Sequence, residues 1–309
     1  MQKPTNYDRY STKLVSSTLC SLCLSPTKSG VRQVSIGRQK SVTHTRRHTI
    51  ASFSSNLVHM TRISKCSRLA ASASEVLARD ESKTAVVDFY LLGQSRDGID
   101  LTQIRSVQES LWSVQYAIPG VVASFFGSVP ECRCHDDRTF DFAIVFRFSN
   151  AAACKNFLEN ERFSTLLKTS FQEASSDLLT FTIQQHVMND LETIFRKGPQ
   201  FEEGCDHVIV TQLAESQNAE DAIQFLSVLG EVTTQSEIGA SSTSLGTLVE
   251  TSDAQLQSEL LIMATHVGNV QGVKNLEAMP PVQQLWEENG NGLLRAVISF
   301  AIQLDTSEK

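Results

Sequence analysis

A run of six residues, Cys132-Arg133-Cys134-His135-Asp136-Asp137, brings thiol, imidazole and carboxylate groups together in one segment. These groups can hold zinc, but a structural zinc site needs two to four residues between paired cysteines and a second ligand pair elsewhere. The run has a single residue between its cysteines and no second pair, so we predict no metal site. We interpret it as an exposed polar loop, with a redox-sensitive loop as the alternative.

The elements that would position such groups occur twice in the chain, at a fixed offset of 119 residues. The matching pairs are Gly120 with Gly239, Gly127 with Gly246, Asn150 with Asn269, Lys155-Asn156 with Lys274-Asn275, and 181–184 with 300–303. A repeat this long indicates a duplicated domain rather than a solenoid, whose units run to roughly 20–50 residues.

Apolar periodicity predicts four strands and two helices in each copy. In the first copy we expect strands over 86–92, 121–129, 140–148 and 178–187, helices over 101–118 and 151–174, and a polar loop over 130–138. In the second copy we expect strands near 207–213, 241–250, 258–267 and 294–304, and helices near 219–229 and 270–288. Pro280-Pro281 should bend or delay the last helix, because proline cannot donate a backbone hydrogen bond.

The resulting order, β-α-β-β-α-β, predicts an α+β fold of two tandem ferredoxin-like repeats. We expect the first domain over 84–188, a linker over 189–204 and the second domain over 205–305. Helices cover only one face of each sheet, so the two helix-free faces need each other. We therefore predict that they meet within one chain as an intrachain dimeric α/β barrel, and that neither copy folds well alone.

Three side chains on the first strands are candidate ligand contacts. Alternation along a strand places Asp88 and Tyr90 on one face, and the offset of 119 places His207 over Asp88. If the sheets pair around a pseudo-twofold axis, Asp88, Tyr90 and His207 point into the barrel and form polar contacts in a ligand cavity. The alternative is that His207 is a hydrogen-bonded interior or edge residue.

The first 74 residues differ in charge from the rest of the chain. They hold twelve Lys and Arg against one acid, Asp8, whereas residues 75–309 hold fifteen against 33, which gives net charges of +11 and −18. An N-terminus poor in acids and rich in Arg and Ser is typical of an organelle transit peptide. We predict a disordered transit peptide over 1–74 and a chloroplast location, with peroxisome or cytosol as the alternative; a basic arm that touches nucleic acid would be another interpretation.

Several stretches resemble the stress-responsive dimeric α/β-barrel family of plants, in its two-copy chloroplast form. They are the order of elements, Ser124-Phe125-Phe126-Gly127 at the end of the second strand, Phe148-Ser149-Asn150 before the second helix, and His207-Val208-Ile209-Val210. The last stretch looks like the family's first strand, which carries a histidine at that place. The resemblance covers roughly 84–305 and implies the barrel fold and a part in stress responses.

The chain departs from the family's most diagnostic motif, a tyrosine followed by a His-Pro-x-His run in the second helix. Phe157 and Phe163 occupy the positions of the tyrosine and the last histidine in the first copy, and Leu276 and Val282 occupy them in the second. One relative is a polyketide cyclase, whose reaction resembles acid–base chemistry by that pair. Proton transfer needs a titratable group, so the resemblance does not extend to this activity.

The sequence therefore favours a plastid stress-response protein without catalysis of its own, which holds a small apolar metabolite in the barrel. The alternatives are a cyclase- or monooxygenase-like enzyme and a defence or antimicrobial protein. We expect no catalytic residues, no cofactor and no metal. The acidic charge of residues 75–309 argues against nucleic acid and membrane as partners, and a homodimer beyond the intrachain pair is left open.

Overall fold

The computed structural model describes residues 73–198, 201, 203–214, 217–236, 238–253, 256, 260–287 and 292–304. The chain divides into two units, Met1–Ala51 and Ser52–Lys309, and all described residues belong to the second. The predicted transit peptide, except for its last two residues, lies outside the described residues. Its disorder and its function as a leader stay predictions.

The strands of the described residues form one closed barrel, in the order β1-β3-β2-β8-β5-β7-β6-β4. They are β1 (Lys83–Ser95), β2 (Val121–Cys134), β3 (Phe142–Phe148), β4 (Ser175–Met188), β5 (Cys205–Leu213), β6 (Ala240–Thr251), β7 (Leu260–Val267) and β8 (Leu294–Leu304). Neighbouring strands are antiparallel throughout. The two copies join through β2 with β8 and through β4 with β6, so each sheet edge is paired. The predicted α+β class and the closed barrel within one chain are confirmed.

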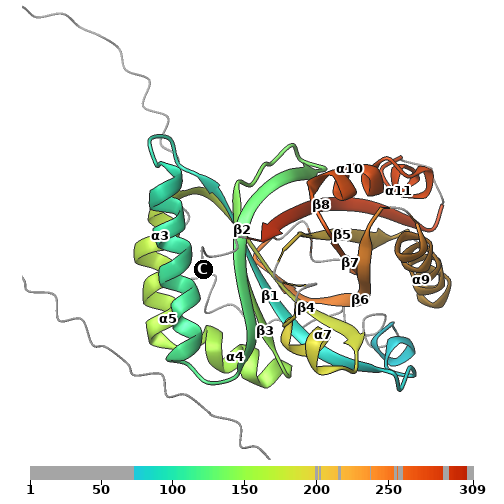
Figure 1. Cartoon of the computed structure of the whole chain (residues 1–309), viewed down its shortest axis with the longest axis horizontal. Helices are drawn as coiled ribbons and strands as arrows, with labels where there is room; N and C mark the ends of the chain where they lie inside the picture. The colour runs from blue at the N-terminus through green and yellow to red at the C-terminus, as the bar shows by residue number, and fades with distance from the viewer. Residues whose placement is uncertain are drawn as a thin grey trace, which may run out of the picture. The chain divides into compact units, whose positions relative to one another are not determined.

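Helices cover the barrel on two opposite sides (Figure 1). On one side lie α3 (Leu101–Trp112), a 3₁₀ turn (Ser113–Tyr116), α4 (Ala151–Leu158), α5 (Glu161–Leu166), a π-helical turn (Leu167–Phe171) and α6 (Gln172–Ala174). On the other lie α9 (Ala219–Gln235), α10 (Val270–Glu277) and α11 (Pro280–Gln284). The linker contains α7 (Leu191–Phe195), which packs against β2 and β4. Three main apolar clusters result: one under each group of helices, which we call the first and second helical layers, and one inside the barrel.

Equivalent asparagines begin the second helix of each copy and confirm the repeat. Asn150 and Asn269 have nearly the same extended backbone, with φ of −166° and −169°, and each side chain accepts a hydrogen bond from the amide three residues on. Such a cap satisfies an amide that the helix leaves free. The helices α4 and α10 that follow are both eight residues long.

The second helix of each copy is broken, where one continuous helix was expected over 151–174. In the first copy Asn160 caps a new helix after α4, and in the second copy α11 begins at Pro280. Proline is well tolerated in the first helical turn, where its missing amide has no partner to lose. Both copies thus have the break, including the first, which has no proline there. Pro280-Pro281 is therefore compatible with the break but is not its cause.

The gap-free offset is wrong by one residue in the first strand of the second copy. In the β1–β3 register Asp88 pairs with Arg147, and in the β5–β7 register Asp206 pairs with His266. Arg147 and His266 are 119 residues apart, but Asp88 and Asp206 are 118 apart. The structural counterpart of His207 is therefore Phe89. A one-residue slip moves every side chain of a strand to its other face.

The extra residue lies between the start of α9 and the turn before β6. The helix caps Asp100 and Asn218 are 118 residues apart, whereas the left-handed turn glycines Gly120 and Gly239 are 119 apart. Only glycine adopts such positive φ values, 107° and 77°, without strain.

Strand β2 is longer than predicted, because it runs on to Cys134 instead of ending at Val129. The β2–β8 register shifts between Ser128 and Glu131, so Pro130 sits in a bulge, where a strand tolerates a missing amide donor. Cys132 and Cys134 thus belong to a strand and not to the predicted loop.

The proposed domain boundaries remain predictions, since both copies contribute to one barrel.

Candidate functional site

Asp88 lies on the interior face of β1 and is held by a buried ion pair. Its two carboxylate oxygens accept from Nε and Nη2 of Arg147, both at 2.7 Å. Both side chains are at most 3% exposed. The remaining Arg147 nitrogen, Nη1, donates to the carbonyl of Thr193 in α7 at 2.8 Å. Asp88 therefore holds Arg147 in the position from which it anchors the linker to the barrel. The charge of Asp88 is neutralised by the same side chain.

Tyr90 shares this interior face and is also satisfied by protein groups. Its hydroxyl accepts from Nε2 of Gln185 at 3.2 Å, and Oε1 of Gln185 accepts from Ser244. Its ring packs against Phe181 and Phe300, each with centroids 5.9 Å away. Burial raises the pKa of Tyr90 well above its usual value, with the nearby carboxylates adding to the effect. At this level the barrel interior is filled by its own side chains.

A second buried charge cluster lies at the structural counterpart of Asp88. Asp206 accepts from Arg196 at 2.8 Å and contacts Nδ1 of His266 at 2.7 Å, while Nε2 of His266 contacts the carbonyl of Glu203. Burial alone would raise the pKa of Asp206, but Arg196 and His266 together hold it far below its usual range. The Arg196 guanidinium lies 4.3 Å from the centre of the Phe125 ring, so it also ties the linker to β2.

His207 does not point into the barrel, contrary to expectation. It follows Asp206 on β5 and therefore faces the second helical layer, where Nε2 lies 2.7 Å from Oε1 of Glu277 at the end of α10. The same oxygen accepts from the hydroxyl of Ser299 on β8 at 2.7 Å. The structure brings Asp88 and Tyr90 together and places His207 in a different compartment, for which the one-residue slip is the reason.

These three side chains form a polar cluster, His207–Glu277–Ser299, in a mostly apolar layer. Although burial works to raise it, the hydrogen bond to His207 leads the effects that lower the pKa of Glu277, with contributions from Ser299 and the nearby Arg133. The Arg133 guanidinium in turn lies 4.1 Å from the centre of the Trp286 ring. The cluster thus extends across the join between β2 and β8.

Two polar atoms of this layer are buried without a hydrogen-bond partner, Nδ1 of His207 and Nε1 of Trp286. A buried polar group left unpaired costs about 1–3 kcal/mol, so a water molecule or a polar ligand group would stabilise each of these atoms. With Nε2 fixed against a carboxylate, Nδ1 of His207 can accept from a hydroxyl group or, as N–H, donate to a hydroxyl or carbonyl oxygen. Chemically the cluster can bind one polar group of a small molecule or exchange a proton with it.

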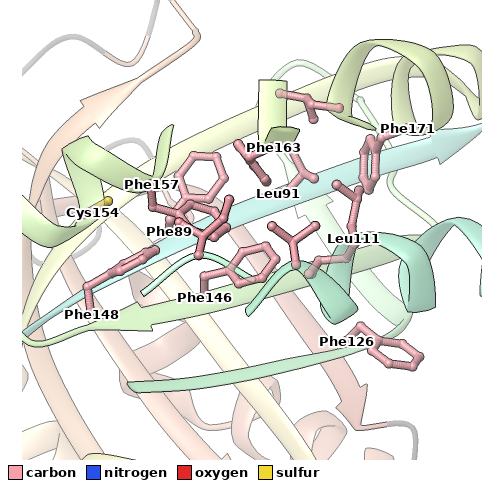
Figure 2. Close-up of a cluster of buried hydrophobic side chains, with 14 of the residues drawn as sticks. Phe89, Leu91, Leu111, Phe126, Phe146, Phe148, Cys154, Phe157, Phe163 and Phe171 are labelled. Carbon is pink, nitrogen blue, oxygen red and sulfur yellow. The ribbon is translucent and has the colours of Figure 1, made fainter. Parts of the chain in front are cut away.

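The first helical layer has no imidazole–carboxylate pair among the described residues, and its buried polar atom without a hydrogen-bond partner is Oγ of Ser124, beside Phe146. The counterparts of His207 and Glu277 are Phe89 and Leu158, and the layer is packed with phenylalanine. Figure 2 shows Phe157 of α4 and Phe163 of α5 packed, with tilted rings, against the strand residues Phe89 and Phe146. The ring centroids of Phe157 and Phe163 are 4.5 Å apart.

All four side chains at the family's tyrosine and histidine positions are core residues. Phe157, Phe163, Leu276 and Val282 are at most 1% exposed and belong to the two helical layers. None can transfer a proton, so acid–base chemistry in the second layer would depend on His207 and Glu277.

Sequence reasoning missed the partners of all three candidates, which are Arg147 for Asp88, Gln185 for Tyr90 and Glu277 for His207. Arg147 gave a signal, since it is the single charged residue in the buried strand Phe142–Phe148. Asp206 gave another, as an acid beside His207 in a buried strand. Glu277 and Ser299 gave none, because helix ends and strands both carry such residues on their solvent faces.

Among the described residues, no three metal-binding side chains come together, and no helix is long and apolar enough to cross a membrane. No protein-family model matches the chain, and no curated protein sequence matches it.

The comparison with solved structures found matches of low identity. They include an anthrone oxidase-like protein, with 10% identity, a TM-score of 0.48 and coverage of 74% of this chain and 96% of that one. A proposed monooxygenase from Fusobacterium nucleatum has 13% identity and a TM-score of 0.45, and covers 72% and 92%. A heme-binding protein from Thermus thermophilus has 12% identity and a TM-score of 0.42, and covers 72% and 94%. Likeness at this level carries no argument about function.

Proposed function

We propose that this protein binds a small, largely apolar molecule in its second helical layer, without catalysis of its own, as a stress-response protein of the chloroplast. The observation that carries the proposal is the buried imidazole of His207, fixed by Glu277 through one nitrogen and unpartnered at the other. A ligand site needs only one or a few polar groups in an apolar surround to orient its ligand.

The size of the surrounding side chains supports this location. The second layer has Thr265, Val267, Leu276 and Val282 where the first has Phe146, Phe148, Phe157 and Phe163. Each of these replacements is smaller. A layer built from smaller side chains accommodates a ligand with less rearrangement than a layer filled by packed aromatic rings.

The barrel interior, where the ligand was expected, is a poorer place. Tyr90, Phe181 and Phe300 pack against one another there, and Asp88 and Tyr90 already have protein partners. A ligand contacting them would have to displace a buried ion pair or an aromatic cluster. The proposal therefore moves the ligand from Asp88 and Tyr90 to His207.

Binding of 4-propylphenol by the full-length chain, measured by calorimetry, tests the location. This probe has one hydroxyl for Nδ1 of His207 and an apolar body. We expect His207→Phe, which installs the first copy's residue, to weaken binding about tenfold, the value of one neutral hydrogen bond. Tyr90→Phe is the matched control in the barrel interior and should leave affinity unchanged. Absence of binding, or loss in Tyr90→Phe alone, would contradict the proposal.

A second candidate is an enzyme that uses His207 as a base, and the pair His207–Glu277 is the observation in its favour. A carboxylate orients an imidazole for proton transfer in many hydrolytic and cyclising enzymes. The assay is turnover of linear tetraketide-type substrates by the full-length chain. We expect none above background; turnover that disappeared in both His207→Ala and Glu277→Gln would establish the enzyme instead.

The chloroplast location is carried by the acid-poor, basic N-terminal segment. A fluorescent fusion of the whole chain should accumulate in chloroplasts, and a fusion that begins at residue 73 should not. A cytosolic or peroxisomal signal from the whole-chain fusion would overturn the location while leaving the binding proposal intact. Light scattering of the same chain decides whether a homodimer forms.

A further inference from the structure

Two thiols lie side by side at the end of β2, outside the candidate site. Cys132 and Cys134 alternate onto the same face of the strand, and their sulfur atoms are 3.7 Å apart. Both are half-buried at the edge of the barrel interior, next to its apolar cluster. Their strand segment pairs with β8 beyond the bulge, so the pair sits on the join between the two copies.

We propose that Cys132 and Cys134 form a reversible dithiol–disulfide centre, which exchanges with low-molecular-weight disulfides and thiols of the glutathione type. The two cysteines are already in sulfur–sulfur contact and half accessible, whereas Cys154 and Cys205 are buried. The second copy has Thr251 and Asp253 at the equivalent positions, so this centre belongs to the first copy alone.

The strand geometry allows the bond but keeps it labile. Residues two apart in a strand have Cα atoms about 6.6 Å apart, at the rise of an extended chain. Disulfides usually span roughly 4.4–6.8 Å between Cα atoms, so this pair is near the upper limit. A disulfide under such strain is reduced more readily than a structural one, which is the property of a regulatory bond.

The surroundings distinguish the two thiols. A hydrogen bond with Cys134, aided by the Phe140 amide and the Arg138 guanidinium, lowers the pKa of Cys132, whereas that hydrogen bond and burial raise the pKa of Cys134. Burial raises the pKa of Cys154 to about 12 and that of Cys205 to about 11. Since the thiolate is the reactive form, these neighbours favour Cys132 as the attacking thiol and Cys134 as the resolving one.

The exchange proceeds in two steps. The Cys132 thiolate attacks one sulfur of oxidised glutathione, forming a mixed disulfide and releasing one glutathione thiolate, which takes up a proton. Cys134 then loses its proton and attacks the sulfur of Cys132, forming the internal disulfide and releasing the second glutathione. Two cysteine thiols are oxidised and one glutathione disulfide is reduced to two thiols, so atoms and electrons balance.

Arg133 would carry the oxidation state to the candidate ligand site, an effect that rests on the proposed function. It lies between the two cysteines, on the opposite face of β2, and its guanidinium contacts the Trp286 ring. Drawing the cysteines together changes the local strand geometry and therefore the position of Arg133 beside Glu277. Affinity for 4-propylphenol should then differ between the reduced and oxidised protein.

The test is incubation of the reduced full-length chain with oxidised and reduced glutathione, followed by alkylation and peptide mass spectrometry. We expect the peptide containing Cys132 and Cys134 to lose two hydrogens and to escape alkylation, while Cys154 and Cys205 stay reduced. Cys134→Ser should trap glutathione on Cys132, and Cys132→Ser should take up at least several-fold less on Cys134. Both replacements are at half-buried positions, and circular dichroism checks that each variant is folded.

Three results would overturn the proposal. They are two free thiols at high oxidised glutathione, pairing of Cys132 with any cysteine other than Cys134, or equal glutathione uptake by the two serine variants. Disulfide formation is measured without the phenol probe, so failure of the ligand proposal leaves this test valid. An internal disulfide with unchanged phenol binding would remove only the coupling through Arg133.

Discussion

The two helical layers occupy equivalent places in one barrel but are built from different chemistry. The first has Phe89 and Leu158 where the second has His207 and Glu277, and it is packed by phenylalanine throughout. Its packed rings bury much apolar area, and its unpaired buried polar atom is the hydroxyl oxygen of Ser124. The second layer has two unpaired buried polar atoms, and both belong to side chains with ring nitrogens, His207 and Trp286. Under the proposed function, the first copy contributes mainly to stability and the second copy also provides the ligand site.

The interior ion pair of the first copy should give the largest effect on stability. Replacing Arg147 by Met leaves the buried Asp88 carboxylate unpaired and also frees the Thr193 carbonyl, so we expect a loss of about 3–5 kcal/mol. The double variant Asp88→Leu/Arg147→Met removes both charges and should recover most of that loss. Urea denaturation measures both; a loss below about 1 kcal/mol in the single variant would show that this pair does not fasten the barrel.

The phenylalanine core should be nearly as sensitive. Phe157→Ala removes a ring that packs against Phe163, Phe146 and Phe148, and large-to-small changes of this kind cost about 3–5 kcal/mol. Its counterpart Leu276→Ala should cost less, toward the lower end of about 2–5 kcal/mol. Equal or reversed losses in urea denaturation would contradict the view that the first layer carries more of the stability.

A larger side chain in the second helical layer tests whether that layer has space for a ligand. Val282→Phe copies Phe163 into the second layer, where overpacking of a full core would cost about 1–3 kcal/mol. We expect a cost below about 1 kcal/mol and loss of 4-propylphenol binding, because the added ring takes the space of the ligand. Phe163→Val is the reciprocal control and should destabilise without affecting binding. A strongly destabilised Val282→Phe variant would mean that the layer is already full.

Acid should reveal the interior charges of the second copy. The folded-state pKa of Asp206 lies below its unfolded value of about 3.9, so its contribution to stability is present above that value and is lost as the pH falls. Stability of the full-length chain should therefore fall below about pH 4. Asp206→Asn should be less stable at neutral pH and should lose less on acidification. Parallel pH profiles for the two proteins would exclude this role.

The order of elements and the helix starts could be predicted, because both depend on local sequence. Asn150 and Asn269 act as caps through their own neighbouring amides, and alternation identifies a strand without its partner. The face of His207 could not be predicted, since the gap-free comparison carries a single inserted residue across a segment of low identity. A shift of one residue is invisible in composition but reverses the direction of a strand side chain.

The partners of the candidate residues could not be predicted from the sequence either. Arg147 stood out in a buried strand, but its partner depended on the β1–β3 register. The cluster His207–Glu277–Ser299 joins a strand, a helix end and another strand, separated by up to 92 residues. Contacts of this kind arise from closure of the barrel, which no local pattern encodes.

The most direct test of the difference between the two layers is the nuclear magnetic resonance spectrum of the histidine side chains, with and without 4-propylphenol. The full chain contains seven histidines, and His207→Phe identifies the resonance in question. We predict that the Nδ1 signal of His207 shifts on titration with the probe while the Tyr90 ring signals stay in place. A shift of the Tyr90 signals with His207 unaffected, or no shift at all, would contradict the assignment of the site to the second layer.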